Sequence, residues 1–249
     1  MHAAMLALIK SKTGEVGMDD KLLSALGNEL IAAAIAVLLV GGYQLFLHLR
    51  LRKDPLYTVQ GVNALARAQW VQAVMADGKK DVLAVQTLRN SIMGPTFLAS
   101  TAVLLIIGTL TLTGQASDLS SVWHVLNIAG LRYSETFAIK LAILLFDFFV
   151  AFFAFAMAIR MFIHVGYMVN VPEALQHRDI TPRYVAFHLN RAGRYHTIGM
   201  RAYYYSVPLL FWLFGPHLLV IASAALVVLM YRMDRAPKID ASKPLEPSD

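Results

Sequence analysis

The chain has no cysteine among its 249 residues, so it has no disulfide, no thiolate nucleophile and no cysteine-ligated zinc or iron–sulfur cluster. Charged residues are scarce as well, at 15% of the chain, where soluble domains usually have about 25%. The sequence also lacks a Walker A loop, a Gly-x-Gly-x-x-Gly turn, a His-Glu-x-x-His pair and a Ser-His-Asp order. Nucleotide binding and hydrolysis therefore have no motif here, and we expect no enzyme activity, no cofactor and no nucleic-acid partner.

Four long apolar runs are what the sequence has instead, at residues 30–47, 92–112, 141–159 and 205–231. Three of them carry no Asp, Glu, Lys or Arg. Each approaches the about 20 residues that cross about 30 Å of hydrocarbon as a helix. This pattern predicts an all-α protein, an integral membrane four-transmembrane-helix bundle.

One membrane domain is predicted over residues 24–235, with spans at about 27–49, 88–112, 136–163 and 204–231. Before it, residues 1–23 contain a short apolar stretch followed by Lys10 and Lys12, without a small-residue cleavage site. This favours a retained N-terminal interfacial segment over a signal peptide. After it, residues 236–249 combine prolines with charges and are predicted to form a disordered tail.

Basic residues predict the orientation in the membrane. The connectors at residues 50–89 and 160–201 hold thirteen Lys and Arg, whereas the two tails and the remaining connector hold eight. Cytoplasmic loops are enriched in basic residues. Four crossings would therefore put both long connectors in the cytoplasm and both termini in the periplasm.

Both long connectors also contain helical patterns. In the first, apolar residues recur every three or four positions between Val59 and Met75, and Trp70 is placed as an anchor at headgroup level. Asp81 then stands where a cap would start the next helix. In the second connector, Pro182 opens a helical stretch. We predict that both are amphipathic helices at the cytoplasmic interface.

Asp147 and His217 lie inside the third and fourth predicted spans. A charged group at the centre of a span costs about 2.5 to 3.5 kcal/mol and usually has a partner. Counting residues along two antiparallel spans puts the two side chains within about one turn of the same depth, so we predict an intramembrane polar pair. It is either a structural hydrogen bond that fixes packing or a proton- or ion-coupling site. Lys140 is expected to extend outward to water.

Polar residues should also gather at the cytoplasmic ends of the spans, where they suit anionic lipid headgroups or the acidic surface of a partner. This predicted cluster consists of Gln86, Arg89, Asn90, Arg160, His164 and Arg201. Ordinary anchoring at the membrane surface would explain the same residues. His48 and His164 end spans on this side too, which would let them face each other as axial ligands of a haem.

Small residues on the spans predict helix packing. Gly41, Gly42, Ala151, Ala154 and Ala158 would let a second helix approach closely, either from another copy or from a partner. The sequence thus favours a non-enzymatic protein that self-associates or is an accessory subunit of a membrane complex, with anionic lipids as partners on the cytoplasmic side. Two alternatives stay open: an oligomeric ion channel or proton-coupled carrier using Asp147 and His217, and a haem-binding membrane protein.

Several short motifs resemble a known family, the domain of unknown function 599 of bacterial and plant integral membrane proteins. Its second span is matched by Arg89, Asn90, Phe97, Ala99, Ser100 and Thr101, and its later motifs by Lys140, Arg160 and residues 201–204. The exit of the third span departs from the family pattern at Ala158 and Ile159. The resemblance covers about residues 30–234, implies a four-helix fold in a bacterial inner membrane and assigns no reaction.

Overall fold

The computed structural model describes residues 2–77, 80–114, 134–171 and 178–237. These residues form the helices α1 (His2–Lys53), α2 (Val59–Met75), α3 (Asp81–Gly114), α5 (Ser134–Val169), α6 (Pro182–Phe214) and α7 (Pro216–Asp234), and the described part contains no strand. Four of the helices have segments long and apolar enough to cross a membrane: Leu26–Lys53, Asp81–Gly114, Thr136–Val169 and Pro216–Asp234. The prediction of an all-α protein with four membrane-spanning helices is confirmed.

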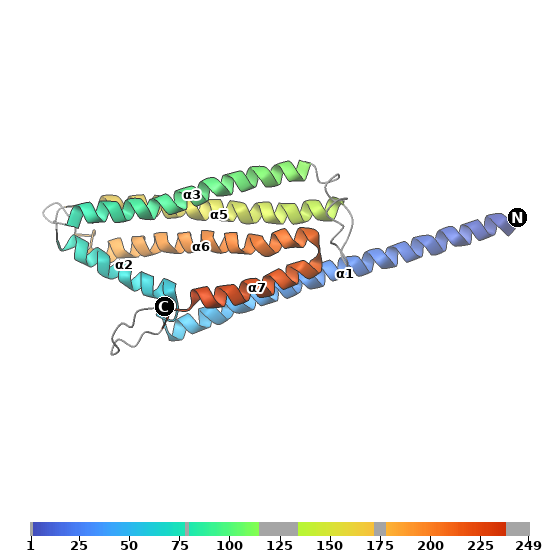
Figure 1. Cartoon of the computed structure of the whole chain (residues 1–249), viewed down its shortest axis with the longest axis horizontal. Helices are drawn as coiled ribbons and strands as arrows, with labels where there is room; N and C mark the ends of the chain where they lie inside the picture. The colour runs from blue at the N-terminus through green and yellow to red at the C-terminus, as the bar shows by residue number, and fades with distance from the viewer. Residues whose placement is uncertain (1, 78–79, 115–133, 172–177, 238–249) are drawn as a thin grey trace, which may run out of the picture.

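The long helices lie side by side in the order α3, α5, α6, α7, α1, and α2 crosses one end of this array (Figure 1). Packing is extensive only between neighbours in that order and between α2 and α6. Buried apolar residues accordingly occupy the seams between adjacent helices. One such cluster joins α3, α5 and α6 through Ile106, Leu141 and Leu213, and another joins α1 and α7 through Tyr43 and Met230.

This arrangement is open, closer to a single layer than to a closed bundle. The accessible surface of the chain is 16404 Å², whereas a compact monomer of this mass exposes about 11,000 Å². Part of the excess belongs to the N-terminal half of α1, which projects beyond the other helices (Figure 1). Large apolar side chains are also exposed along the described helices, among them Leu104, Phe146 and Phe153, and an aqueous protein could not leave so many uncovered.

The predicted fourth span at residues 204–231 is wrong as one continuous helix. The chain reverses at Gly215, and α6 and α7 lie against each other as a hairpin (Figure 1). Gly215 has φ 156° and ψ 157°, a conformation essentially restricted to glycine. Pro216 follows as the first residue of α7, where its missing N–H costs nothing. The Gly-Pro pair therefore forms a turn where hydropathy alone indicated a kinked span.

The starts of α2 and α6 follow the local signals in the sequence. The Thr58 hydroxyl accepts a hydrogen bond from the Gly61 N–H, and the Thr181 hydroxyl accepts one from the Tyr184 N–H. Both are N-caps that satisfy a backbone donor left free at the first turn. The predicted helix from Val59 to Met75 and the predicted start at Pro182 are confirmed.

Helices α5 and α6 approach closely because Gly199 has no side chain. A Cβ placed there would lie 2.6 Å from a ring carbon of Phe155, far inside van der Waals contact. The Phe155 ring is fully buried and packs edge-on against His196 and Tyr203, with centroid separations of 5.9 and 5.4 Å. Helices α5 and α6 pack more extensively than any other pair of described helices, so α6 passes back through the depth of α5 although it is not one of the four apolar candidate spans.

The chain reversal also places the end of α7. We use the term basic end for the end of the layer that holds Lys53, α2 and the starts of α3 and α6. Asp234 lies there, and the residues after it are tied to the connector between α1 and α2, because the Ala236 N–H donates to the Tyr57 carbonyl over 3.0 Å. The segment Leu26–Lys53 begins at the opposite end (Figure 1).

Because α7 ends at the basic end and the segment Leu26–Lys53 begins at the opposite end, the structure does not support the expectation that both termini lie on one side of the membrane. Helix α1 is continuous from His2 to Lys53, and an interfacial role for residues 1–23 stays a prediction. The predicted tail lies outside the described residues, apart from positions 236 and 237.

Candidate functional site

The predicted lipid or partner cluster is divided by the structure. Five of its members are exposed on α3 and α5 toward the basic end: Gln86, Arg89, Asn90, Arg160 and His164. The sixth, Arg201, is only 19% exposed and points inward, where its guanidinium forms an ion pair of 2.9 Å with Asp234. The expectation that all six share one surface is wrong for Arg201, because a carboxylate on the neighbouring helix holds its charge.

Arg201 is the centre of a polar network that joins α1, α6 and α7. Its guanidinium also donates to Gln44, whose amide donates to Tyr205. The Tyr43 hydroxyl donates to the same Asp234 oxygen over 2.7 Å. Each polar group thus has a partner in the seam, as the low dielectric surroundings require. The network ties the end of α7 to the middle of α6 and to the last third of α1.

A second polar contact lies at the other end of the layer. Lys140 and Glu29 are 5% and 6% exposed, and Lys140 Nζ lies 2.8 Å from Glu29 Oε1. The other Glu29 oxygen accepts from Trp212 Nε1 over 2.7 Å, and Lys140 also donates to the Trp212 carbonyl over 3.2 Å. The expectation that Lys140 extends outward is wrong, because Glu29 and Trp212 satisfy its ammonium inside the protein.

The Asp147–His217 pair does not form. Asp147 Oδ2 and His217 Nδ1 are buried atoms, each without a hydrogen-bond partner in the described part of the chain. Because of the turn at Gly215, His217 is the second residue of α7 rather than the middle of a span. Lys140 contacts Trp212 just before that turn, and Asp147 lies two helical turns further along α5, about 10 Å deeper.

The structure also does not bring His48 and His164 face to face, as the haem alternative requires. The His164 ring packs edge-on against His188 of α6, with ring centroids 6.4 Å apart. His48 is exposed on α1, and the residues on either side of it on α1, Leu47 and Leu51, pack with α7 and not with α5. Burial, the neighbouring His164 and the Arg191 charge lower the pKa of His188, in that order. The neutral form of its imidazole is therefore favoured near neutral pH.

Small residues separate into two groups. Ala151, Ala154 and Ala158 are all buried on α5, where they take part in packing within the chain, so their predicted role as a contact surface for another copy is wrong. Gly41 and Gly42 are exposed on α1, and a Cβ at either position would meet nothing within 4 Å. These two glycines remain open to an external helix.

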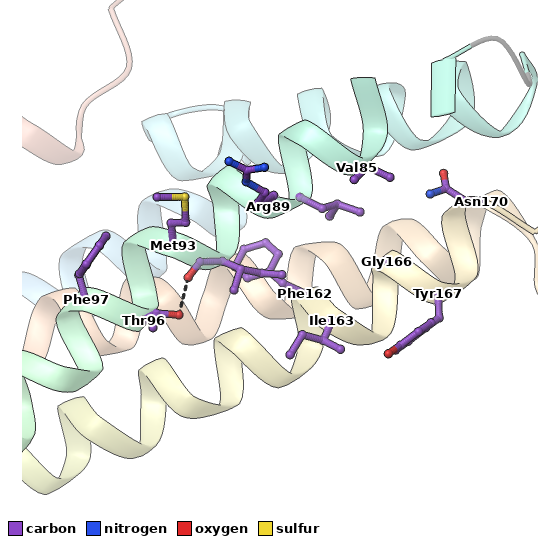
Figure 2. Close-up of a pocket in the computed structure, with 12 residues that line it drawn as sticks. Val85, Arg89, Met93, Thr96, Phe97, Phe162, Ile163, Gly166, Tyr167 and Asn170 are labelled. Atoms are coloured by element: carbon purple, nitrogen blue, oxygen red, sulfur yellow. Dashed lines mark hydrogen bonds between the residues drawn. The ribbon is translucent and has the colours of Figure 1, made fainter. Parts of the chain in front are cut away.

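An apolar groove runs between α3 and α5 on the half of the layer toward the basic end (Figure 2). Its volume is about 440 Å³. The lining includes Leu88, Met93 and Phe97 of α3 and Phe162 and Ile163 of α5. Two polar side chains, Arg89 and Asn170, are among its lining, and the buried Asn170 Oδ1 has no hydrogen-bond partner among the residues that the structure describes. The groove is a binding site in form, with an apolar interior and polar groups toward one end.

Sequence reasoning missed several of these groups. Glu29 and Gln44 are polar residues in the first span and could have been noticed as such, but no spacing indicates that Glu29 meets Lys140 or that Gln44 meets Arg201. Their partners are 111 and 157 residues away in the chain. Asn170 follows the last turn of α5 and carries no signal in the sequence.

The fold and these contacts define a class, that of multi-pass helical membrane proteins with buried polar contacts between helices. Residues 31–239 match a family described as "Protein of unknown function, DUF599". The chain belongs to this family, as its motifs indicated. No curated protein and no solved structure that was compared with the chain matches it.

Proposed function

We propose that the protein is a non-catalytic subunit of a membrane assembly, formed with further copies of itself or with a partner chain. The observation that supports this most is the open layer of helices, which leaves α1 with an uncovered outer face at one edge. Leu30, Leu38 and Leu45 on this face are 70%, 73% and 60% exposed.

Gly41 and Gly42 supply the centre of that outer face. They lie between Leu38 and Leu45, within one helical turn of each. Small residues let two helices approach closely in a membrane, where van der Waals packing rather than hydrophobic burial drives association. The open space above both glycines is the room that a second helix would occupy.

Oligomeric state in lipid nanodiscs tests this proposal. Native mass spectrometry should show more than one protein chain per particle, or a partner in fixed stoichiometry. Gly42→Leu should shift the population to the single chain, because the added side chain keeps an approaching helix away while the fold has room for it. Gly108→Leu is the matched control, since its Cβ would also meet nothing within 4 Å but it lies on α3, at the opposite edge. A monomeric wild-type protein would refute the proposal.

The proposal also covers the membrane in which the protein lies and its orientation there. A bacterial inner membrane with the basic end in the cytoplasm is consistent with the described Lys and Arg residues, because most lie in the half of the layer toward that end. These are Arg50, Arg52, Lys53, Arg67, Lys80, Arg89, Arg160, Arg178, Arg183, Arg191, Arg194, Arg232 and Arg235. The positive-inside tendency then orients the whole protein.

A further inference from the structure

We infer that the groove between α3 and α5 is a binding site for one phospholipid of the bilayer, with an anionic phosphate and a hydroxyl-bearing headgroup, as in phosphatidylglycerol. One acyl chain occupies the apolar groove, the phosphate meets Arg89 and the headgroup hydroxyls lie beside the side chain of Asn170. This site is independent of the assembly face on α1, because it lies at the other edge of the layer.

The length of the groove matches the thickness of one leaflet of the bilayer. From Val85 to Phe97 the lining extends over thirteen residues of α3, and their Cα atoms cover about 18 Å of helix. Half of the hydrocarbon core is about 15 Å thick. Phe97 is also near the middle of α3 (Asp81–Gly114), so the groove ends near mid-depth. A lipid spans one leaflet in this way, whereas a transmembrane helix from a partner would need a groove through both.

The interior of the groove is suited to methylene groups. The hydroxyl of Thr96 donates to the Ile92 carbonyl of its own helix over 2.9 Å, so no unpaired hydroxyl faces the groove from this position (Figure 2). Gly166 contributes no side chain to the wall, and a Cβ there would reach only Leu88, at 3.9 Å. The space beside Gly166 therefore stays free for a chain. Each methylene group removed from water contributes about 0.8 kcal/mol. An acyl chain elsewhere in the bilayer already has this gain. The apolar groove alone therefore does not select one lipid over another.

Selectivity comes from the two polar groups. Arg89 is exposed and forms no hydrogen bond or ion pair with the described residues. Its Cα lies eight residues, about 12 Å, from that of Phe97 along α3, just inside the edge of the hydrocarbon, and its long side chain extends outward to the phosphates. A guanidinium binds a phosphate with charge-assisted hydrogen bonds. Figure 2 shows Asn170 at the opposite end of the groove from Phe97, beside the start of α3. Its side chain lines the groove, and a glycerol headgroup offers it hydroxyl groups without the second positive charge that a choline headgroup would bring beside Arg89.

Lipid retention in native mass spectrometry tests the site. The full chain is released from nanodiscs that contain equal amounts of phosphatidylglycerol and phosphatidylcholine, and the lipid that stays bound is identified. Wild-type protein should retain phosphatidylglycerol preferentially. Arg89→Gln should reduce that preference about tenfold, the loss of one charge-assisted contact at a partly exposed site. Arg194→Gln, which changes an exposed arginine of α6 outside the groove, should leave the preference unchanged.

A second pair of variants tests the groove itself. Gly166→Leu should reduce retention of both lipids because the leucine side chain occupies the space of the acyl chain, and Gly108→Leu should not. Phosphatidylglycerol with a photoreactive acyl chain should label peptides that contain Met93, Phe97 or Ile163. Equal retention of the two lipids by the wild type would overturn the inference. So would loss of retention in Arg89→Gln without loss in Gly166→Leu, which would indicate a headgroup on the surface and no chain in the groove.

Discussion

Two acidic side chains in membrane-spanning helices, Glu29 and Asp147, have opposite surroundings. Both oxygens of Glu29 are bonded, one to Lys140 and one to Trp212, whereas Asp147 Oδ2 has no partner in the described part of the chain. Removing one member of a buried ion pair leaves the other charge unpaired, and this costs more than removing both. An unpartnered carboxylate contributes no such loss when it is replaced.

Lys140→Met should therefore destabilise the protein by about 3 to 5 kcal/mol. The double variant Glu29→Gln, Lys140→Met should be more stable than Lys140→Met alone, because the amide carries no charge and its oxygen still accepts from Trp212. Thermal unfolding in detergent measures both. Asp147→Asn serves as the control and should stay within about 1 kcal/mol of wild type or exceed it. Equal losses in the single and double variants would show that the two charges are not coupled.

At the scale of helices, close packing depends on single positions. Gly199 lets α5 and α6 meet through the Phe155 ring, and Gly193 gives the same room to Arg67, whose guanidinium carbon would lie 2.8 Å from a Cβ placed there. The two neighbours would respond differently to a Cβ added at each glycine. A ring buried on all sides cannot move away, whereas the end of an arginine side chain can rotate. Helix α2 is further held to α6 by the Arg67 hydrogen bond to Asn190, of 2.8 Å.

Gly199→Ala should consequently destabilise the protein by about 1 to 3 kcal/mol, the usual range for overpacking a core. Gly108→Ala, where a Cβ meets nothing, measures the gain in helix propensity alone, up to about 1 kcal/mol. Combining Gly199→Ala with Phe155→Leu should recover part of the stability, since the smaller side chain makes room. Unfolding by SDS titration would follow all three. A neutral Gly199→Ala would mean that the helices can separate without cost.

Local signals predicted several helix starts, and hydropathy predicted three of the four spans. Thr58 and Pro182 act within one turn of the chain, so the sequence contains all that positions α2 and α6. Gly215 is different, because a glycine followed by proline is compatible with a kink and with a reversal. Only the packing of α7 against α6 and α1 decides between them, and that packing involves residues far apart in the sequence. The same reason explains why Arg201 was placed at the lipid surface and Asp147 beside His217.

At the scale of the whole molecule, the turn at Gly215 sets the topology. With α6 passing back beside α5, the end of α7 returns to the basic end, and the start of the Leu26–Lys53 segment lies at the other. The residues after α7 therefore join the cytoplasmic side if the positive-inside tendency holds. Sequence counting placed them on the opposite side because it took α6 and α7 as one span.

Cysteine labelling in intact cells checks this topology, and the absence of native cysteine removes background. Gly78→Cys and Ala236→Cys should both be protected from a membrane-impermeant maleimide and react after lysis. Ser117→Cys, between α3 and α5, should react from outside. Labelling of Ala236→Cys from outside together with protection of Gly78→Cys would contradict the reversal at Gly215.

The pairing of α1 with α7 has a consequence for biosynthesis. Tyr43 and Asp234 bond to each other although 191 residues separate them, so α1 packs mainly on the helix of this layer that is synthesised last after it. At about 5 to 20 residues per second, roughly 10 to 40 s pass between their synthesis. During that interval the face of α1 that contacts α7, with Tyr43 and Leu47, has no α7 of its own chain to cover it, and the insertion machinery or the α7 of a completed copy is the partner available to it. Exchange of α1 between copies is thus a route to assembly that the chain order itself favours.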